Sequence, residues 1–324
     1  MTAEWFEQAG FGLFLHFGLC SAAARHEWVQ NYERLTDAEY APYFTHFEPD
    51  RFDATAIATA ARQAGMGYAV LTAKHHEGFS LWDTALSDFS APKACGRDLV
   101  AEFVDATRSA GLRVGLYFSL LDWHHPDFAI DWNHPRRDDP QAVRLNENRD
   151  PAAYRDFLHG QVRELLTGYG QIDYLFFDFT YPEHRDGWDG KSADCWDSPG
   201  LLAMCRELQP DMLVNDRLGI PGDFVTPEQY QPTSGFASEG RAQAWEACQT
   251  MNGSWGYDRD NLEHKPAHLI AEMLAESVSL GGNLLLNVGP DGRGAIPARD
   301  LTTLEAVGAW LDLHSSAIVG AGPA

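Results

Sequence analysis

The sequence is short of basic residues and of long apolar runs. Its 324 residues include 24 Lys and Arg against 47 Asp and Glu, which gives a formal net charge of −23. Such a surface repels the phosphates of nucleic acids and of anionic membranes, so neither is expected as a partner. No apolar run reaches the roughly 20 residues of a membrane-spanning helix. The first residues lack the basic and apolar regions of a signal peptide, which predicts a cytoplasmic protein as given, or a secreted or periplasmic one if a leader was removed.

Cysteine is scarce and nucleotide-binding motifs are missing. The five cysteines are odd in number and show no CxxC spacing, so free thiols are expected rather than disulfides or a zinc site. No GxGxxG motif follows an apolar run, and no GxxxxGK[ST] motif occurs, which argues against a bound nucleotide. We therefore expect no cofactor. What the chain does have is apolar residues, at 44%, which is enough for a full core.

Apolar runs of strand length alternate with segments of helical periodicity along the whole chain. This alternation, with connections long enough for parallel crossovers, favours an α/β fold, and a (β/α)₈ barrel over a Rossmann sheet. We predict one catalytic domain over residues 1–324. The expected strands are residues 11–18, 68–73, 112–118, 172–180, 212–215 and 283–288, and the expected helices are residues 53–64, 98–110, 150–166, 198–208, 266–280 and 301–314.

Polar side chains gather at the ends of several predicted strands. In a parallel barrel the C-terminal strand ends lie at one face, so these residues predict a polar cup. Tryptophans in the nearby connections add flat apolar walls, and this combination suits a sugar, whose C–H faces stack on rings while its hydroxyls need hydrogen-bond partners. The loop of residues 123–148 is predicted to cover this site. The strand-end residues are His16, His75, His76, Glu77, Tyr117, Asp178, Asn215, Asp216, Arg217 and Asn287.

Asp178 and the histidines each allow more than one interpretation. Asp178 ends the apolar run 172–180, where it either carries out chemistry or caps the following loop. The histidines could bind a metal ion, but consecutive strand residues face opposite ways, so His75 and His76 cannot both reach one ion without a bulge. No HxH or HExxH pattern occurs either, so we expect no metal and favour hydrogen bonding to ligand hydroxyls.

Several blocks of the sequence, in order and over nearly the whole chain, resemble the α-L-fucosidases of glycoside hydrolase family 29. Members often carry a C-terminal β-sandwich, which we expect to be absent from this chain or to have been removed. The matching blocks are residues 12–18, 26–28, 71–79, 115–123, 172–180, 214–217, 245–248, 253–257 and 280–290.

The resemblance implies a retaining hydrolase that acts on terminal α-L-fucosides through two carboxyl groups. Asp178 matches the family's nucleophile. The acid/base should lie about 5–5.5 Å away; Glu228 is favoured for it, Glu246 beside Trp245 is the rival, and Glu27 and Glu239 are less favoured. Tyr117 or Phe118 takes the place of a pocket tyrosine. The positions that match the fucose pocket are His16, Glu27, Trp28, His75, His76, Tyr117, Phe176, Arg217 and Trp255.

The expected partner is a fucosylated oligosaccharide or glycoconjugate, and the oligomeric state is left open. The main alternative is a protein that binds fucose or cleaves another sugar with weak or altered turnover. A metal-dependent hydrolase, sensitive to chelators, is the third interpretation.

Overall fold

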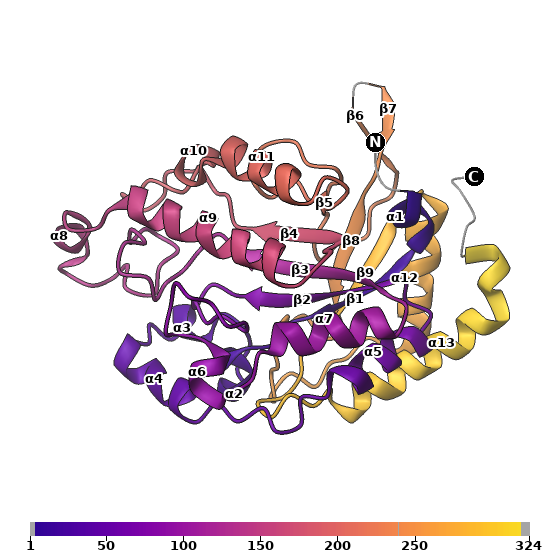
Figure 1. Ribbon diagram of the computed structural model, residues 1–324. Helices are drawn as coiled ribbons and strands as arrows, with labels where there is room; N and C mark the ends of the chain where they lie inside the picture. Colours follow the sequence, from indigo (N-terminus) through magenta and orange to yellow (C-terminus); the bar gives the residue numbers. More distant parts are fainter. Residues whose placement is uncertain (1–3, 239, 319–324) are drawn as a thin grey trace.

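The computed structural model describes residues 4–238 and 240–318. Its centre is a curled sheet of seven parallel strands in the order β5-β4-β3-β2-β1-β9-β8. Strands β2 and β4 point to the left in Figure 1, away from both chain ends and toward the long connecting loops. The strands are β1 (Phe11–Leu15), β2 (Tyr68–Lys74), β3 (Arg113–Ser119), β4 (Tyr174–Asp178), β5 (Leu213–Val214), β8 (Glu246–Thr250) and β9 (Asn283–Val288).

The sheet closes into a barrel through residues 224–228, which form isolated bridges rather than a full strand. This segment lies between β5 and β8 and pairs in parallel with both sides. It stays short because the surrounding stretch contains Pro221, Pro227 and Pro232, each of which lacks the N–H that a strand ladder needs. The predicted (β/α)₈-like fold is confirmed, and the eighth position in the barrel is filled by this segment of isolated bridges. The bridges are Asn215–Phe224, Val225–Trp245 and Glu228–Cys248.

Six longer helices cover the outside of the sheet. Four of them begin after an aspartate whose side chain accepts a backbone N–H of the first turn, which satisfies donors that the helix itself leaves free. These caps are Asp53, Asp98, Asp150 and Asp197. The helices are α5 (Ala54–Gln63), α7 (Leu99–Ser109), α9 (Pro151–Gly168), α11 (Ser198–Leu208), α12 (Ala267–Ser279) and α13 (Ala298–Ile318).

Shorter elements lie in the connections. None of the helices in the described ranges is both long and apolar enough to cross a bilayer. A small antiparallel hairpin replaces a helix between β5 and β8, and it projects from the barrel at the top of Figure 1. These elements are α1 (Glu4–Ala9), α2 (Leu19–Ala23), α3 (Val29–Tyr32), α4 (Asp37–Thr45), α6 (Ala91–Cys95), α8 (Ala142–Asn146), α10 (Ala193–Trp196), β6 (Phe236–Ser238) and β7 (Arg241–Gln243).

The barrel interior is filled by side chains from alternate strand positions, as strand geometry requires. A cluster of large rings occupies it, including Tyr68, Tyr174 and Phe176, with Phe6 of α1 below them. Gly12 leaves room for one of these rings, because a Cβ on Gly12 would lie 2.3 Å from the Tyr68 ring. The interior is therefore a packed core.

The predicted elements match the structure to within a few residues, but strand β8 of the central sheet, the hairpin strands β6 and β7 and the short connecting helices were missed. Residues 283–288 were predicted as they are found, and the first strand is shorter than predicted because it ends at Leu15. Strand β8 was missed, since the sequence Glu-Ala-Cys-Gln-Thr offers little apolar signal. All five of its residues are buried, so the barrel and not the local sequence determines this strand.

Candidate active site

Asp178 is the last residue of β4 and lines a cavity at the mouth of the barrel. One carboxylate oxygen accepts a hydrogen bond from the Tyr117 hydroxyl at 2.9 Å. The other lies 3.1 Å from Nη1 of Arg217 and accepts the backbone N–H of Phe179 at 3.0 Å. Burial raises the pKa of Asp178 to about 6, although the charge of Arg217 opposes the rise. Asp178 is therefore mostly ionised at neutral pH and is held in place by three donors.

Arg217 joins Asp178 to a second carboxylate, that of Glu228. Nη2 of Arg217 lies 2.8 Å from a carboxylate oxygen of Glu228, while Nη1 contacts Asp178. Nε donates to the Thr226 hydroxyl at 2.8 Å, and Nη2 to the Thr226 carbonyl at 3.0 Å, which fixes the plane of the guanidinium. Burial alone would lower the pKa of Arg217, but the carboxylate of Asp178 raises it above its ordinary value. One permanent cation thus holds two acidic groups from different segments.

The cavity has a volume of about 220 Å³, which gives room for a single sugar ring. Ten of the twelve residues predicted for the site line it, and Glu27 and Glu246 do not. Tyr117 rather than Phe118 takes the tyrosine position. The lining residues are Phe14, His16, Trp28, His75, His76, Tyr117, Phe176, Asp178, Phe179, Thr180, Tyr181, Arg217, Glu228, Cys248 and Trp255.

His16 is an uncharged hydrogen-bonding group in the cavity wall. Burial, and then the nearby His75, lowers its pKa well below the ordinary value. Nδ1 of His16 lies 2.6 Å from Oδ1 of Asn287, whose amide nitrogen donates to the Trp255 carbonyl. That second bond fixes the amide orientation, so Nδ1 of His16 carries the proton and Nε2 is left as an acceptor. The cavity wall therefore offers a fixed acceptor for a ligand hydroxyl.

His76, which follows the end of β2, is arranged in the same way. Burial, and then the nearby His75, lowers its pKa well below the ordinary value. Nδ1 of His76 lies 2.7 Å from the Ser119 hydroxyl, and that hydroxyl donates to the Leu121 carbonyl. Because the serine proton is already used, Nδ1 of His76 is the donor and its Nε2 is an acceptor.

Aromatic rings form the apolar part of the wall. The Trp255 ring lies 5.1 Å from the His16 ring and 5.8 Å from Phe14, which in turn lies 5.3 Å from Phe176. Glu27 was predicted to line the pocket, but it lies behind this wall: one carboxylate oxygen accepts the backbone N–H groups of Trp255 and Gly256 at 3.1 and 2.8 Å. Glu27 therefore supports the wall and does not line the cavity.

His75 and His76 both line the cavity although they are consecutive in the chain. Strand β2 ends at Lys74, and its register with β3 shifts between Thr72 and Lys74, so the alternation expected of a regular strand stops before the histidines. Their ring centroids lie 3.9 Å apart. Across the described residues, no group of three or more His, Cys, Asp or Glu side chains is placed to hold a metal ion.

Glu246 lies at the opposite end of the barrel from the cavity, as the first residue of β8. It is fully buried and accepts hydrogen bonds from the hydroxyls of Tyr174, at 2.6 Å, and Tyr68. Burial raises the pKa of Glu246 to about 7, against the effect of these two donors. The prediction of Glu246 as a rival acid/base is corrected, because its carboxyl group is enclosed in the barrel floor. Glu239, the other outside candidate, is not among the described residues.

Sequence reasoning missed five of the cavity-lining residues. Two of them could have been found from strand alternation, since Phe14 lies two positions before His16 and Cys248 two positions after the inward-facing Glu246. The other three, Phe179 and the two residues after it, belong to the loop that leaves β4. Phe179 has a φ of 75°, a left-handed conformation that a bulky residue rarely adopts. Nothing in the sequence pattern predicts this conformation.

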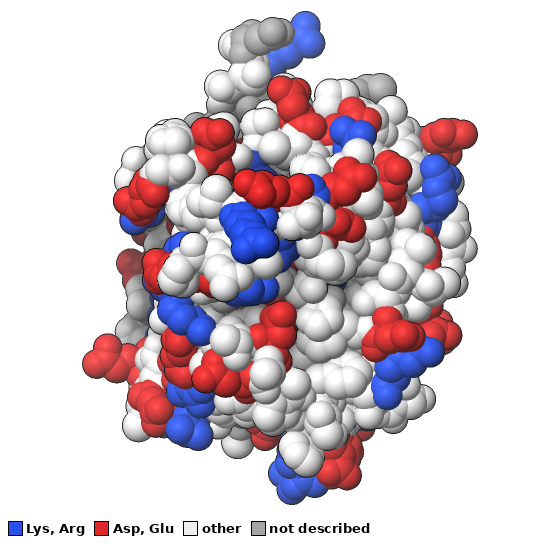
Figure 2. Space-filling model, turned by 90° about the vertical axis from the view of Figure 1, so that its left-hand side faces the viewer, with Lys and Arg blue, Asp and Glu red and all other residues white. Residues whose placement is uncertain are grey.

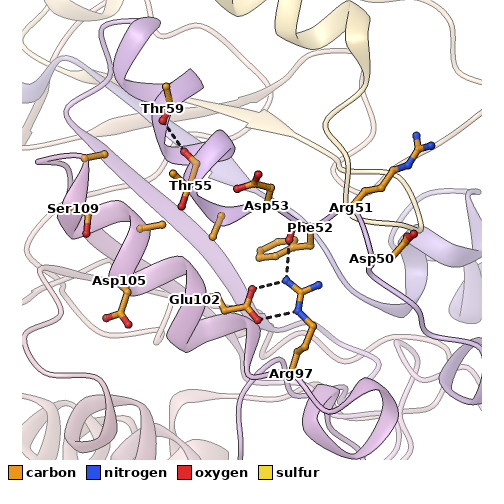
Figure 3. A pocket seen from close by; sticks show the side chains of 13 residues that line it. Asp50, Arg51, Phe52, Asp53, Thr55, Thr59, Arg97, Glu102, Asp105 and Ser109 are labelled. Carbon is orange, nitrogen blue, oxygen red and sulfur yellow. Dashed lines mark hydrogen bonds and ion pairs between the residues drawn. The ribbon is translucent and has the colours of Figure 1, made fainter.

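Another hollow lies on the outside of the barrel between α5 and α7 (Figure 3). Its volume is about 970 Å³. Its main charged groups already satisfy each other: Nε of Arg97 donates to Glu102 at 2.9 Å, and another of its nitrogens donates to the Phe52 carbonyl at 2.8 Å. This hollow is a groove between helices that is held together by its own ion pair, and it offers no comparable group of reactive side chains.

Known proteins resemble this chain over nearly its whole length. The sequence profile described as α-L-fucosidase matches residues 1–316. The tissue α-L-fucosidase of Mus musculus is 31% identical over 355 residues, which cover 99% of this chain and 72% of the mouse protein. Two solved structures share the fold with 99% of this chain aligned. They are α-L-fucosidase isoenzyme 1 from Paenibacillus thiaminolyticus (TM-score 0.93, 43% identity, 77% of that chain) and the Thermotoga maritima α-fucosidase with a mechanism-based inhibitor (0.81, 31%, 76%).

These matches extend over all of the sequence blocks whose residues line the cavity. The cavity lies at the C-terminal face of an α/β barrel, where enzymes of this architecture carry their active sites. The chain belongs to the α-L-fucosidase family, the glycoside hydrolases of family 29.

Proposed function

We propose that this chain hydrolyses terminal α-L-fucosides with net retention, using Asp178 as the nucleophile and Glu228 as the acid/base. The observation that carries the proposal is the guanidinium of Arg217, which contacts both carboxylates at the wall of a cavity of single-sugar size. The two side chains differ in environment: that of Asp178 is 13% exposed and that of Glu228 is 38% exposed. A buried attacker paired with a solvent-accessible proton carrier matches the division of labour in retaining glycosidases.

In the first step a carboxylate oxygen of Asp178 forms a bond to the anomeric carbon while the bond from that carbon to the leaving oxygen breaks. Glu228 gives its proton to the leaving oxygen. In the second step Glu228 takes a proton from water, the water oxygen bonds to the anomeric carbon, and the ester bond to Asp178 breaks. Both carboxyl groups return to their starting protonation states, and one water molecule is consumed.

Arg217 and Tyr117 prepare the nucleophile in this scheme. The Tyr117 hydroxyl donates to Asp178, and burial, together with the Asp178 charge, raises the pKa of Tyr117 well above its ordinary value, so it remains a donor at neutral pH. When Asp178 becomes an ester it loses its charge, and Arg217 then faces Glu228 alone.

The cavity walls support fucose as the sugar. The acceptor nitrogens of His16 and His76 suit ring hydroxyls, and a sugar without a 6-hydroxyl needs an apolar niche for its methyl group. Trp255, Phe14 and Phe176 provide apolar surface in the same cavity. A sugar that carried a hydroxymethyl group in place of the methyl group would leave the added hydroxyl unpaired against these rings.

The test is to follow hydrolysis of an aryl α-L-fucoside by proton NMR and to identify the first anomer released. We expect α-L-fucose to appear first and β-L-fucose to accumulate only through mutarotation. Initial release of β-L-fucose would rule out the double displacement. Binding of fucose without any turnover of this activated substrate would favour the alternative of a binding protein.

A further inference from the structure

A second hollow adjoins the catalytic cavity on the side of the surface loops. This outer cavity has a volume of about 660 Å³, and it shares two lining residues, Trp28 and Phe179, with the catalytic cavity. The Trp28 ring lies 4.9 Å from His76 on one side and 5.9 Å from Tyr32 on the other. The two cavities therefore adjoin each other at Trp28 and Phe179.

Aromatic rings line this outer cavity in the way that carbohydrate sites require. Trp28 and Tyr32 are stacked at an interplanar angle of 22°, and Tyr32 is 63% exposed. Trp132 and Trp188 contribute further rings from two other loops. Flat rings that remain accessible to solvent offer stacking surfaces for the C–H faces of a second sugar.

Three arginines also line the outer cavity, and their charges are only partly compensated. Arg34 pairs with Asp138 at 2.6 Å, and Arg185 pairs with the adjacent Asp186 at 3.3 Å. Arg137 donates to the Asn31 side chain and to a backbone carbonyl, and forms no ion pair with a carboxylate in the described residues. Burial, followed by the charge of Arg34, lowers the pKa of Arg137, while the charge of Asp138 opposes that shift.

This cluster contrasts with the rest of the molecule. The chain carries a formal net charge of −23, yet the charged lining of the outer cavity is three arginines against two aspartates. Figure 2 shows the face toward which β2 and β4 point, with basic side chains gathered near its centre and acidic ones spread around them. The two ion pairs that involve Asp138 and Asp186 are largely exposed, so they cost little to exchange for a ligand.

One further group on the same wall has no partner. Asn133 is 8% exposed and lines the outer cavity, and its side-chain amide nitrogen makes no hydrogen bond within the described residues. A buried amide donor without an acceptor is unfavourable. The wall thus combines this unpaired amide with three arginines, one of which, Arg137, has no carboxylate partner in the described residues.

We propose that the outer cavity is a leaving-group subsite for an anionic sugar, one that carries a carboxylate or a sulfate ester. Guanidinium groups recognise both oxyanions through paired N–H donors, and the aromatic rings take the sugar ring that bears the oxyanion. The proposal rests on the fucosidase function described above and adds the chemical class of the glycan from which fucose is removed. It assigns Arg137 and Arg185 as residues that determine specificity.

The test uses three fucosyl-galactosides in one linkage that the enzyme accepts, with leaving groups that differ only at C6: galactose, galacturonate and galactose 6-sulfate. We expect kcat/KM for at least one acidic substrate to exceed that for the neutral one by about tenfold at low salt, the size of one charge-assisted hydrogen bond. Salt at about 0.5 M should reduce the ratio, because the subsite is open to solvent. A preference for only one acidic substrate identifies the oxyanion, and equal or lower values for both overturn the proposal.

Arg137→Gln should lower the acidic-to-neutral ratio to about two, and Arg185→Gln should lower it by a smaller factor. Arg185 is 65% exposed at its side chain, so its replacement tests the proposal even if Arg137→Gln impairs folding. Arg163→Gln is the matched control, because Arg163 is an exposed arginine on α9 that lines neither cavity. An equal fall of the ratio in the control would assign the effect to overall charge and contradict the subsite.

An aryl α-L-fucoside separates this inference from the function on which it rests. Hydrolysis of the aryl fucoside without any acidic preference overturns the subsite alone. If the aryl fucoside is not hydrolysed, the proposed function fails, and the subsite is then tested by titrating galacturonate and galactose against tryptophan fluorescence. Tighter binding of galacturonate, lost in Arg137→Gln, supports the subsite, and equal binding contradicts it.

Discussion

The mouth and the floor of the barrel each hold a buried carboxyl group beside tyrosine hydroxyls, yet only the mouth is equipped for chemistry. Burial raises the pKa of Asp178 to about 6 at the mouth and that of Glu246 to about 7 at the floor. Asp178 has Arg217 beside it and a cavity in front of it, whereas Glu246 has Tyr68 and Tyr174 and no open space.

The comparison shows that a shifted pKa does not by itself mark a catalytic residue. Desolvation acts on both groups, because both lie inside a barrel. What distinguishes the mouth is a permanent cation, a second carboxylate and access for a ligand. With a pKa of about 7, the carboxyl group of Glu246 is protonated in about half of the molecules at neutral pH and in most of them below it.

The largest expected difference between the two regions is in catalysis. Asp178→Asn should lower kcat/KM on an aryl α-L-fucoside by roughly 10⁴-fold or more, because the amide cannot attack the anomeric carbon. Glu246→Gln makes the same chemical change at the floor and should cost less than about tenfold, since no substrate reaches it. Thermal unfolding should show that both variants are folded, and similar losses in the two would remove the distinction between mouth and floor.

Glu228→Gln should reveal the second carboxyl group of the mouth through its dependence on the leaving group. General acid catalysis contributes about 10²–10⁴-fold, and a leaving group that departs easily needs little of it. We therefore expect a large loss of kcat/KM on fucosyl disaccharides and a small one on nitrophenyl fucoside. Glu272→Gln, at an exposed position on α12, is the control. A loss of equal size on both substrates would contradict the role of Glu228 as the acid.

The smallest expected effect is on stability, and it concerns the floor. The pKa of Glu246 is about 7 in the folded protein and 4.5 ordinarily, so the folded state binds the proton more tightly than the unfolded state does. The stabilisation from this group is therefore complete below pH 4.5 and is lost as the pH rises through 7, by at most about 3 kcal/mol.

Urea unfolding of the wild type and Glu246→Gln at several pH values tests this coupling. Because glutamine does not titrate, the difference in unfolding free energy between the two proteins should change between pH 4.5 and 8, in the direction that disfavours the wild type at high pH. Asp178 titrates in both proteins and cancels from the difference. A difference that is independent of pH would mean that Glu246 is not desolvated in the folded state.

The parts of the fold that sequence could predict are those whose local pattern agrees with their environment. Three helix starts were predicted at aspartates, namely Asp53, Asp98 and Asp150. In the structure α5, α7 and α9 begin directly after them. Strand β8 gave no such signal, because its polar residues are paired by neighbours that lie far away in the sequence. The closing segment 224–228 gave no strand signal either, because Pro227 within it and Pro221 and Pro232 around it are typical of an ordinary loop.

The sequence predicted the site residues well where they lie at or just past the C-terminal end of a strand. It predicted them poorly where the position of a residue along the barrel axis determines whether its side chain reaches the cavity. Asp178 and Glu246 both face inward, and only the barrel register shows that one ends its strand while the other begins one. Glu27 is on the right loop but points to the backbone behind the wall. Spacing within one segment predicts on which face of a strand or helix a side chain lies. The position of that side chain along the barrel axis depends on how all the strands are staggered.

The incomplete closure of the barrel has a consequence for how such an enzyme can change over evolution. Asp178 lies on β4, which is paired on both sides, whereas Glu228 lies on the segment 224–228, which is held only by isolated bridges. Insertions or deletions around residues 219–235 can move Glu228, the proposed proton donor, without disturbing Asp178, the proposed nucleophile. If the two residues have these roles, the two halves of the reaction are free to diverge at different rates, and we expect an alignment of distant relatives to match the position of Asp178 more readily than that of Glu228.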